Sequence, residues 1–105
     1  CFTSDKMGDG DPELGEILIK GFVYALTQLE TPPAVILFYN GGARLTAKDS
    51  PCIEDLRTLQ EQGTEILTCG TCVNFYDLGE PVVGTVTNMY TIAEKLTNAS
   101  KVIRP

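Results

Sequence analysis

The sequence contains no histidine and no tryptophan, and its basic residues are few. Without histidine, a tetrahedral zinc site would need all four cysteines in one place, so we expect no metal site. The 14 acidic residues outnumber the 8 lysines and arginines, which gives a formal net charge of -6. Nucleic acids and anionic membranes repel such a surface, and we therefore expect neither of them as a partner.

The sequence also lacks a long apolar run. The longest one, Ala34–Tyr39, is far too short to span a membrane, and no segment near the start has the pattern of a signal peptide. We therefore expect a cytoplasmic protein. At 105 residues the chain has the length of one small domain, which we place at residues 1–105. Because it begins with Cys1 rather than methionine, we expect a fragment of a longer chain.

Strand-like and helix-like segments alternate along the chain. Short runs rich in β-branched or apolar residues predict strands at Ala34–Tyr39, Thr64–Thr68, Val82–Val86 and Lys101–Ile103. The start, Cys1–Asp5, is expected to be the tail of a further strand. The alternation predicts an α/β fold, a three-layer sandwich with a largely parallel sheet of about five strands.

Four helices are expected between these strands. Asp11 and Pro12 supply a cap and a first-turn proline for the first helix, and its apolar residues recur at three- and four-residue steps. These apolar residues, expected to face the core, are Leu14, Ile17, Leu18, Phe22, Ala25, Leu26 and Leu29. A second helix is expected from the cap Ser50 to Gly63, a third directly after the cysteine pair, and a fourth over about Asn88–Thr97.

Three loops with polar or glycine-rich composition follow the carboxyl ends of the expected strands. They are Ser4–Asp11, Asn40–Ser50 and Cys69–Cys72. In an open parallel sheet such loops line the ligand crevice, so we expect them to converge. We select as pocket elements Asn40, Gly41, Gly42, Thr71 and Asn74. Ordinary turn chemistry also accounts for the glycines, since the sequence has no phosphate-binding glycine motif.

The most informative stretch is CGTC, in which Cys69 and Cys72 stand between a strand-like and a helix-like segment. Two cysteines at a helix start bring their sulfur atoms close together, and the helix amides favour the thiolate. One interpretation is a dithiol–disulfide redox pair, although a thioredoxin-type pair follows an early strand and commonly lies beside tryptophan. A second is a thiol that carries sulfur as a persulfide. A third is a pair of inert cysteines in a ligand-binding or protein-interaction domain.

Within this pair we expect Cys69 to be the nucleophile, because a cap position exposes its sulfur to the free N–H groups of the next turn. Cys72, inside that turn, is the expected auxiliary thiol. No basic residue lies within four residues of either cysteine, so any activating cation must come from another loop, with Arg44 and Lys48 as the candidates. Cys52 lies among apolar residues and is expected in the core.

Nearly the whole chain resembles a known family. Three segments, Ser4–Glu30, Ile36–Leu78 and Val83–Pro105, are together similar to the DsrE/DsrF-like domain at the C-terminus of YedF-type selenium-metabolism proteins. The most specific parts of the resemblance are CGTC with the following NFYDL, and the segment VGTVTNMY.

The resemblance implies a sulfurtransferase-like domain of the sulfur-relay type that bears a cysteine persulfide. By spacing to Leu78, the working cysteine of the family matches Cys69. The family further implies a homo-oligomer, no cofactor, and a sulfur donor or acceptor protein such as the TusA-like domain that precedes this domain in full-length members. The residues of this chain do not distinguish sulfur from selenium.

Overall fold

Three parallel strands form the centre of the computed structural model, which describes all 105 residues. They are β1 (Val35–Phe38), β2 (Glu65–Cys69) and β3 (Thr85–Thr87), and they lie side by side in this order. Phe2 extends the sheet beyond β1 through a single parallel bridge to Phe38. The expected α/β class with a parallel sheet is therefore confirmed, and the strand at the chain start is reduced to one bridge.

The expectation of about five strands is wrong at the C-terminal end. Lys101–Ile103 forms no strand and pairs with none of β1, β2 and β3. The Cys1 backbone nitrogen donates instead to the Ile103 carbonyl. β3 begins at Thr85 rather than at Val82, because the chain first turns through Gly84, whose φ is +70°.

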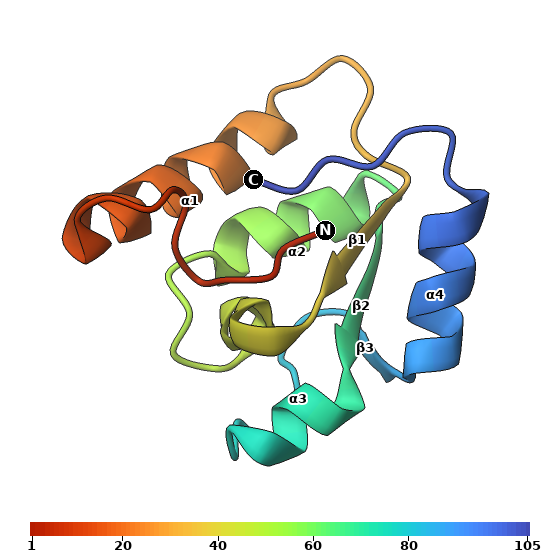
Figure 1. Ribbon diagram of the computed structural model, residues 1–105. Helices are drawn as coiled ribbons and strands as arrows, with labels where there is room; N and C mark the ends of the chain where they lie inside the picture. The colour runs from red at the N-terminus through yellow and green to blue at the C-terminus, as the bar shows by residue number, and fades with distance from the viewer.

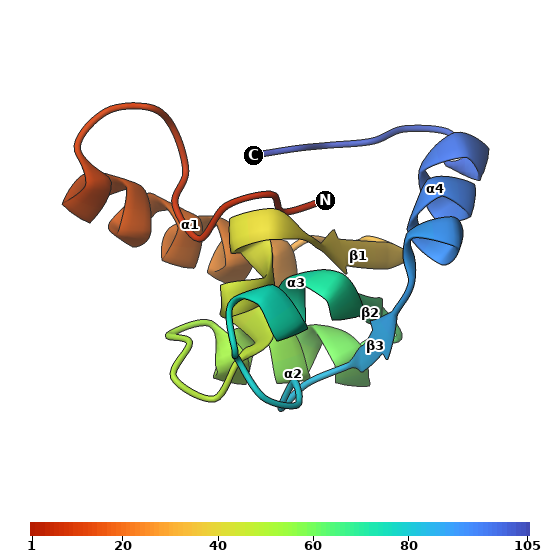
Figure 2. The same cartoon turned by 60° about the horizontal axis from the view of Figure 1, so that its bottom comes forward.

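Helices cover both faces of the sheet (Figure 1). On one face lie α1 (Pro12–Thr27) and α2 (Ile53–Glu61), and α4 (Met89–Asn98) lies on the other. The 3₁₀ helix η1 (Asn40–Thr46) and the short α3 (Gly70–Phe75) follow the carboxyl ends of β1 and β2, as Figure 2 shows from a second side. None of the helices has both the length and the apolar character that a membrane crossing requires.

The helix starts follow local capping chemistry. The Asp11 carboxylate accepts hydrogen bonds from the Glu13 and Leu14 N–H groups, so the predicted cap of α1 is confirmed. α2 begins later than expected: Ser50 Oγ accepts the Cys52 N–H at 3.0 Å, and the helix starts only at Ile53. The stretch expected as a loop after β1 is wound into η1.

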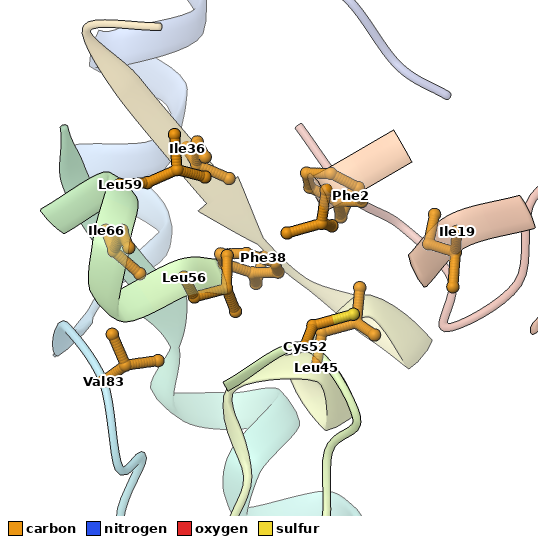
Figure 3. Packing of buried hydrophobic residues seen from close by; sticks show 11 residues of the cluster. Phe2, Ile19, Ile36, Phe38, Leu45, Cys52, Leu56, Leu59, Ile66 and Val83 are labelled. Carbon is orange, nitrogen blue, oxygen red and sulfur yellow. The ribbon is translucent and has the colours of Figure 1, made fainter. Parts of the chain in front are cut away.

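The main core lies between the sheet and the helices α1 and α2 (Figure 3). Alternate residues of the strands, such as Ile36, Phe38 and Ile66, point into it and meet Leu56 and Leu59 of α2. Cys52 is fully buried in this core, as expected. The intervening strand residues face the other way, toward α4, and form a second cluster of Leu37, Leu67, Cys69 and Ile92.

The expected buried face of α1 is wrong. Gly15, Ile19, Val23 and Thr27 are the residues of this helix that face inward. Of the predicted face, Leu14, Ile17, Leu18, Ala25 and Leu29 are exposed, while Phe22 and Leu26 are partly buried at the edge of the core. α1 is apolar on two opposite sides, and the spacing of its residues alone does not determine which side is buried.

Candidate functional site

Cys69 is the last residue of β2 and the N-cap of α3, as the sequence predicts. Its side chain follows the alternation of the strand and therefore points to the same side as Leu67, toward α4. There it is packed in the second cluster and is only 1% exposed. The sulfur forms no cap hydrogen bond with the helix amides. The expectation that a cap position presents the Cys69 sulfur to the free N–H groups of the next turn is wrong.

Cys72 is the more accessible thiol of the pair. It lies in the first turn of α3, is partly exposed, and packs against the cluster that contains Cys69. Its Sγ accepts a hydrogen bond from the Asn40 N–H, with a distance of 3.0 Å between nitrogen and sulfur. A backbone N–H directed at a sulfur atom stabilises the thiolate relative to the thiol.

Asn40 holds this N–H in place through an unusual backbone conformation. Its φ is +52°, in the left-handed region, which asparagine tolerates better than most residues. The Tyr76 hydroxyl donates to Asn40 Oδ1 at 2.9 Å, and the Arg44 guanidinium lies over the Tyr76 ring, 4.5 Å from its centroid. A chain of contacts thus connects Arg44, Tyr76, Asn40 and the Cys72 sulfur across η1 and α3.

Two opposing effects act on the Cys72 thiol. Burial raises the pKa of Cys72 above its ordinary value, and the neighbouring Cys69 thiol raises it further. The Asn40 N–H lowers it, but not enough to cancel the rise. Near neutral pH the free Cys72 is therefore mostly protonated, and its reactivity increases with pH. Burial likewise raises the pKa of Cys52, which belongs to the core and not to the site.

The remaining predicted site residues have different roles. A Cβ at Gly42 would collide with the Phe2 carbonyl, so this glycine permits the start of the chain to pass close by. A Cβ at Gly41 would make only ordinary contact with Ser4. Thr71 and Asn74 are exposed on α3, and no side-chain hydrogen bond connects them to either sulfur. Of the predicted pocket elements, Asn40 alone is brought to the thiols.

A cleft of about 380 Å³ is lined by Arg44 and Lys48. Two of the three loops that were expected to converge meet here, through Asp5 and Lys48, while the third segment is represented by Asp77 after α3 and not by Cys69–Cys72. Neither cysteine of the CGTC stretch lines the cleft. Arg44 therefore reaches Cys72 only through Tyr76 and Asn40, and Lys48 belongs to the cleft.

Tyr76 is the site residue that the sequence interpretation missed. Its spacing supplied a signal, since residues four apart lie on one side of a helix and Tyr76, four residues after Cys72, is the residue that ends α3. No three side chains of the metal-ligating types come together in the structure in an arrangement that could hold an ion.

No family model and no curated protein matches this chain. Among solved structures, it is similar to the "Structure of Protein of Unknown Function MTH1491 from Methanobacterium thermoautotrophicum". The two chains superpose with a TM-score of 0.64 at 20% sequence identity, and the match covers 92% of each. The likeness extends over almost the entire chain, and at this level of identity what the two proteins share is the α/β fold.

Proposed function

We propose that the protein is a sulfur carrier that holds a sulfur atom as a persulfide on Cys72, with Cys69 as the neighbouring auxiliary thiol. The observation that carries the proposal is the partly exposed Cys72 sulfur, which lies beside Cys69 and accepts the Asn40 N–H. The proposal keeps both predicted cysteines and exchanges their roles, because a donor protein cannot reach a side chain that is 1% exposed. The sequence resemblance to DsrE/DsrF-like domains supports the same chemistry.

Loading requires a donor persulfide, such as one on a partner protein. The Cys72 thiolate attacks the outer sulfur of the donor. A sulfur–sulfur bond forms to Cys72, the sulfur–sulfur bond of the donor breaks, and the donor leaves as a thiolate. The products are a Cys72 persulfide and a free donor thiol, with no net oxidation. The Asn40 N–H stabilises the Cys72 thiolate before the transfer.

Two routes can unload the persulfide. In the first, an acceptor thiolate attacks the outer sulfur and takes it, which regenerates the Cys72 thiolate. In the second, the Cys69 thiolate attacks the inner sulfur, the atom that belongs to Cys72. This releases hydrosulfide and leaves a Cys69–Cys72 disulfide, which a dithiol reductant must then reduce. The same steps apply to selenium in place of the transferred sulfur.

The dithiol–disulfide interpretation remains the second candidate, because the two thiols belong to one packed cluster. It differs from the proposal in what it requires of Cys69. A redox pair loses its function when either cysteine is replaced. A carrier that unloads to an external acceptor still loads and releases sulfur after Cys69→Ser.

The proposal is tested by loading the protein with a low-molecular-weight persulfide and measuring its intact mass. Cys69→Ser, in which the second unloading route is blocked, is expected to gain one sulfur atom and Cys72→Ser to gain none, while wild type gains one sulfur atom or ends as the Cys69–Cys72 disulfide. Cys1→Ser, which changes another partly exposed cysteine, serves as the matched control and should load like wild type. An adduct that persists in Cys72→Ser, or that never forms on Cys69→Ser, refutes the assignment.

A further inference from the structure

Asn40 is followed by Gly41, and no other asparagine of the chain precedes a glycine. In such a pair the backbone nitrogen of the second residue can attack the side-chain carbonyl carbon of the first, because glycine has no side chain to hinder the approach. The residues after the other asparagines are phenylalanine, methionine and alanine. This chemistry is therefore expected at Asn40 before any other asparagine.

The structure leaves the reacting groups accessible. Asn40 is exposed and is the first residue of η1. The first hydrogen bond of η1 runs from the Gly42 N–H to the Tyr39 carbonyl, so the Gly41 N–H lies ahead of it and is not used by the helix. The helix therefore does not hold the attacking nitrogen, and water can reach the side-chain amide.

Tyr76 is placed to promote the attack. Its hydroxyl donates to Asn40 Oδ1 at 2.9 Å. That oxygen gains negative charge when the nitrogen adds to the carbonyl carbon, and a hydrogen-bond donor already directed at it stabilises this charge. The Arg44 guanidinium, 4.5 Å from the centroid of the Tyr76 ring, keeps the ring and its hydroxyl in this position.

From these features we infer that Asn40–Gly41 is a self-modifying site, at which the chain deamidates Asn40 with the help of the Tyr76 hydroxyl. The Gly41 nitrogen bonds to Asn40 Cγ and gives its proton to water, and the carbon–nitrogen bond of the side-chain amide breaks with loss of ammonia. Water then opens the cyclic imide at either of its carbonyls, which leaves aspartate or isoaspartate in place of Asn40. The net reaction consumes one water and releases one ammonia, with no oxidation or reduction.

The products act on the neighbouring thiol. An aspartate accepts the Tyr76 hydroxyl as the amide did, but it brings a negative charge to the residue whose N–H donates to the Cys72 sulfur. A negative charge there disfavours the thiolate. Isoaspartate also lengthens the backbone ahead of Gly41 by one carbon atom and so displaces η1. Deamidation should therefore lower the reactivity of Cys72, whether or not this thiol carries sulfur.

Peptide mapping by mass spectrometry, after incubation of the purified protein in warm and mildly alkaline buffer, tests the site. Asn40 is expected to be converted first, to aspartate and isoaspartate, while Asn98 stays intact. Gly41→Ala should slow the conversion severalfold, and its added Cβ makes only ordinary contacts. Tyr76→Phe should slow it about tenfold because the donor to the amide oxygen is lost, with Tyr24→Phe as the control. Circular dichroism checks that each variant is folded.

Asn40→Asp reproduces one of the products and supplies a second readout. Its Cys72 should be alkylated more slowly at neutral pH than in wild type, whereas Asn98→Asp, which adds the same charge at the end of α4, should react like wild type. The site is overturned if Asn40 survives while another asparagine is converted, or if Gly41→Ala leaves the rate unchanged. An unchanged rate in Tyr76→Phe overturns the role of its hydroxyl, and unchanged alkylation in Asn40→Asp overturns the link to the thiol.

Discussion

Two buried threonine hydroxyls are hydrogen-bonded to each other, and stability measurements can show which of them is the donor. Thr46 of η1 and Thr68 of β2 are both fully buried, and their Oγ1 atoms are 2.9 Å apart. Thr46 also donates its hydroxyl proton to the Ala43 carbonyl. A hydroxyl has a single proton, so Thr68 must be the donor in the bond between the two threonines.

The two replacements by valine therefore differ in cost. Thr46→Val removes the acceptor and leaves the buried Thr68 hydroxyl with no partner, and the Ala43 carbonyl also loses its donor. We expect a loss of about 2 to 3 kcal/mol in the free energy of unfolding. Thr68→Val leaves Thr46 bonded to Ala43 and should cost about 0.5 to 1 kcal/mol. In the double variant no hydroxyl remains unpaired, so its cost should fall below that of Thr46→Val alone.

Urea unfolding followed by circular dichroism measures these differences. The dependence of the unfolding free energy on urea should stay unchanged, because the variants bury the same surface. A cost for Thr68→Val equal to or larger than that for Thr46→Val would refute the assigned donor. Additive costs in the double variant would show that the two hydroxyls do not interact.

Two further predictions concern the thiol site and the entry to β3. Tyr76→Phe removes the hydrogen bond that holds Asn40, so the Cys72 pKa should rise further and the alkylation of Cys72 at neutral pH should slow roughly twofold. Tyr24→Phe is the control. An alkylation rate whose dependence on pH is the same as in wild type contradicts this prediction. Gly84→Ala forces a Cβ against the Ile66 carbonyl at a φ of +70°, so the free energy of unfolding, measured in urea, should fall by at least about 2 kcal/mol. A stability equal to that of wild type would contradict this prediction and show that β2 and β3 adjust to the added methyl group.

Local patterns in the sequence were enough for most secondary structure. The cap at Asp11, the apolar run of β1 and the strand–helix junction at Cys69 all depend on neighbouring residues, and the structure confirms each of them. The parallel arrangement of the sheet follows from the alternation of helices and strands. The class of the fold was therefore accessible without coordinates.

The candidate site was accessible only in part. CGTC marked the two thiols, and the residues after β1 marked Asn40, because both lie where parallel strands end. The contact of Tyr76 with Asn40 joins residues that are 36 positions apart, and no local pattern determines such a pairing. The strand predicted at Lys101–Ile103 did not form, and strand formation likewise depends on pairing with a distant segment, which no local pattern determines.

The sequence by itself determined the elements, their order and the identity of the thiols, because capping and periodicity act over a few residues. Tertiary structure alone decided which thiol is accessible. Strand alternation places Cys69 on the side of Leu67, but only the packing of α4 buries it there, while Cys72 stays partly exposed. It also decided which of the two apolar sides of α1 faces the core, because one side packs on the sheet and α2 and the other is exposed.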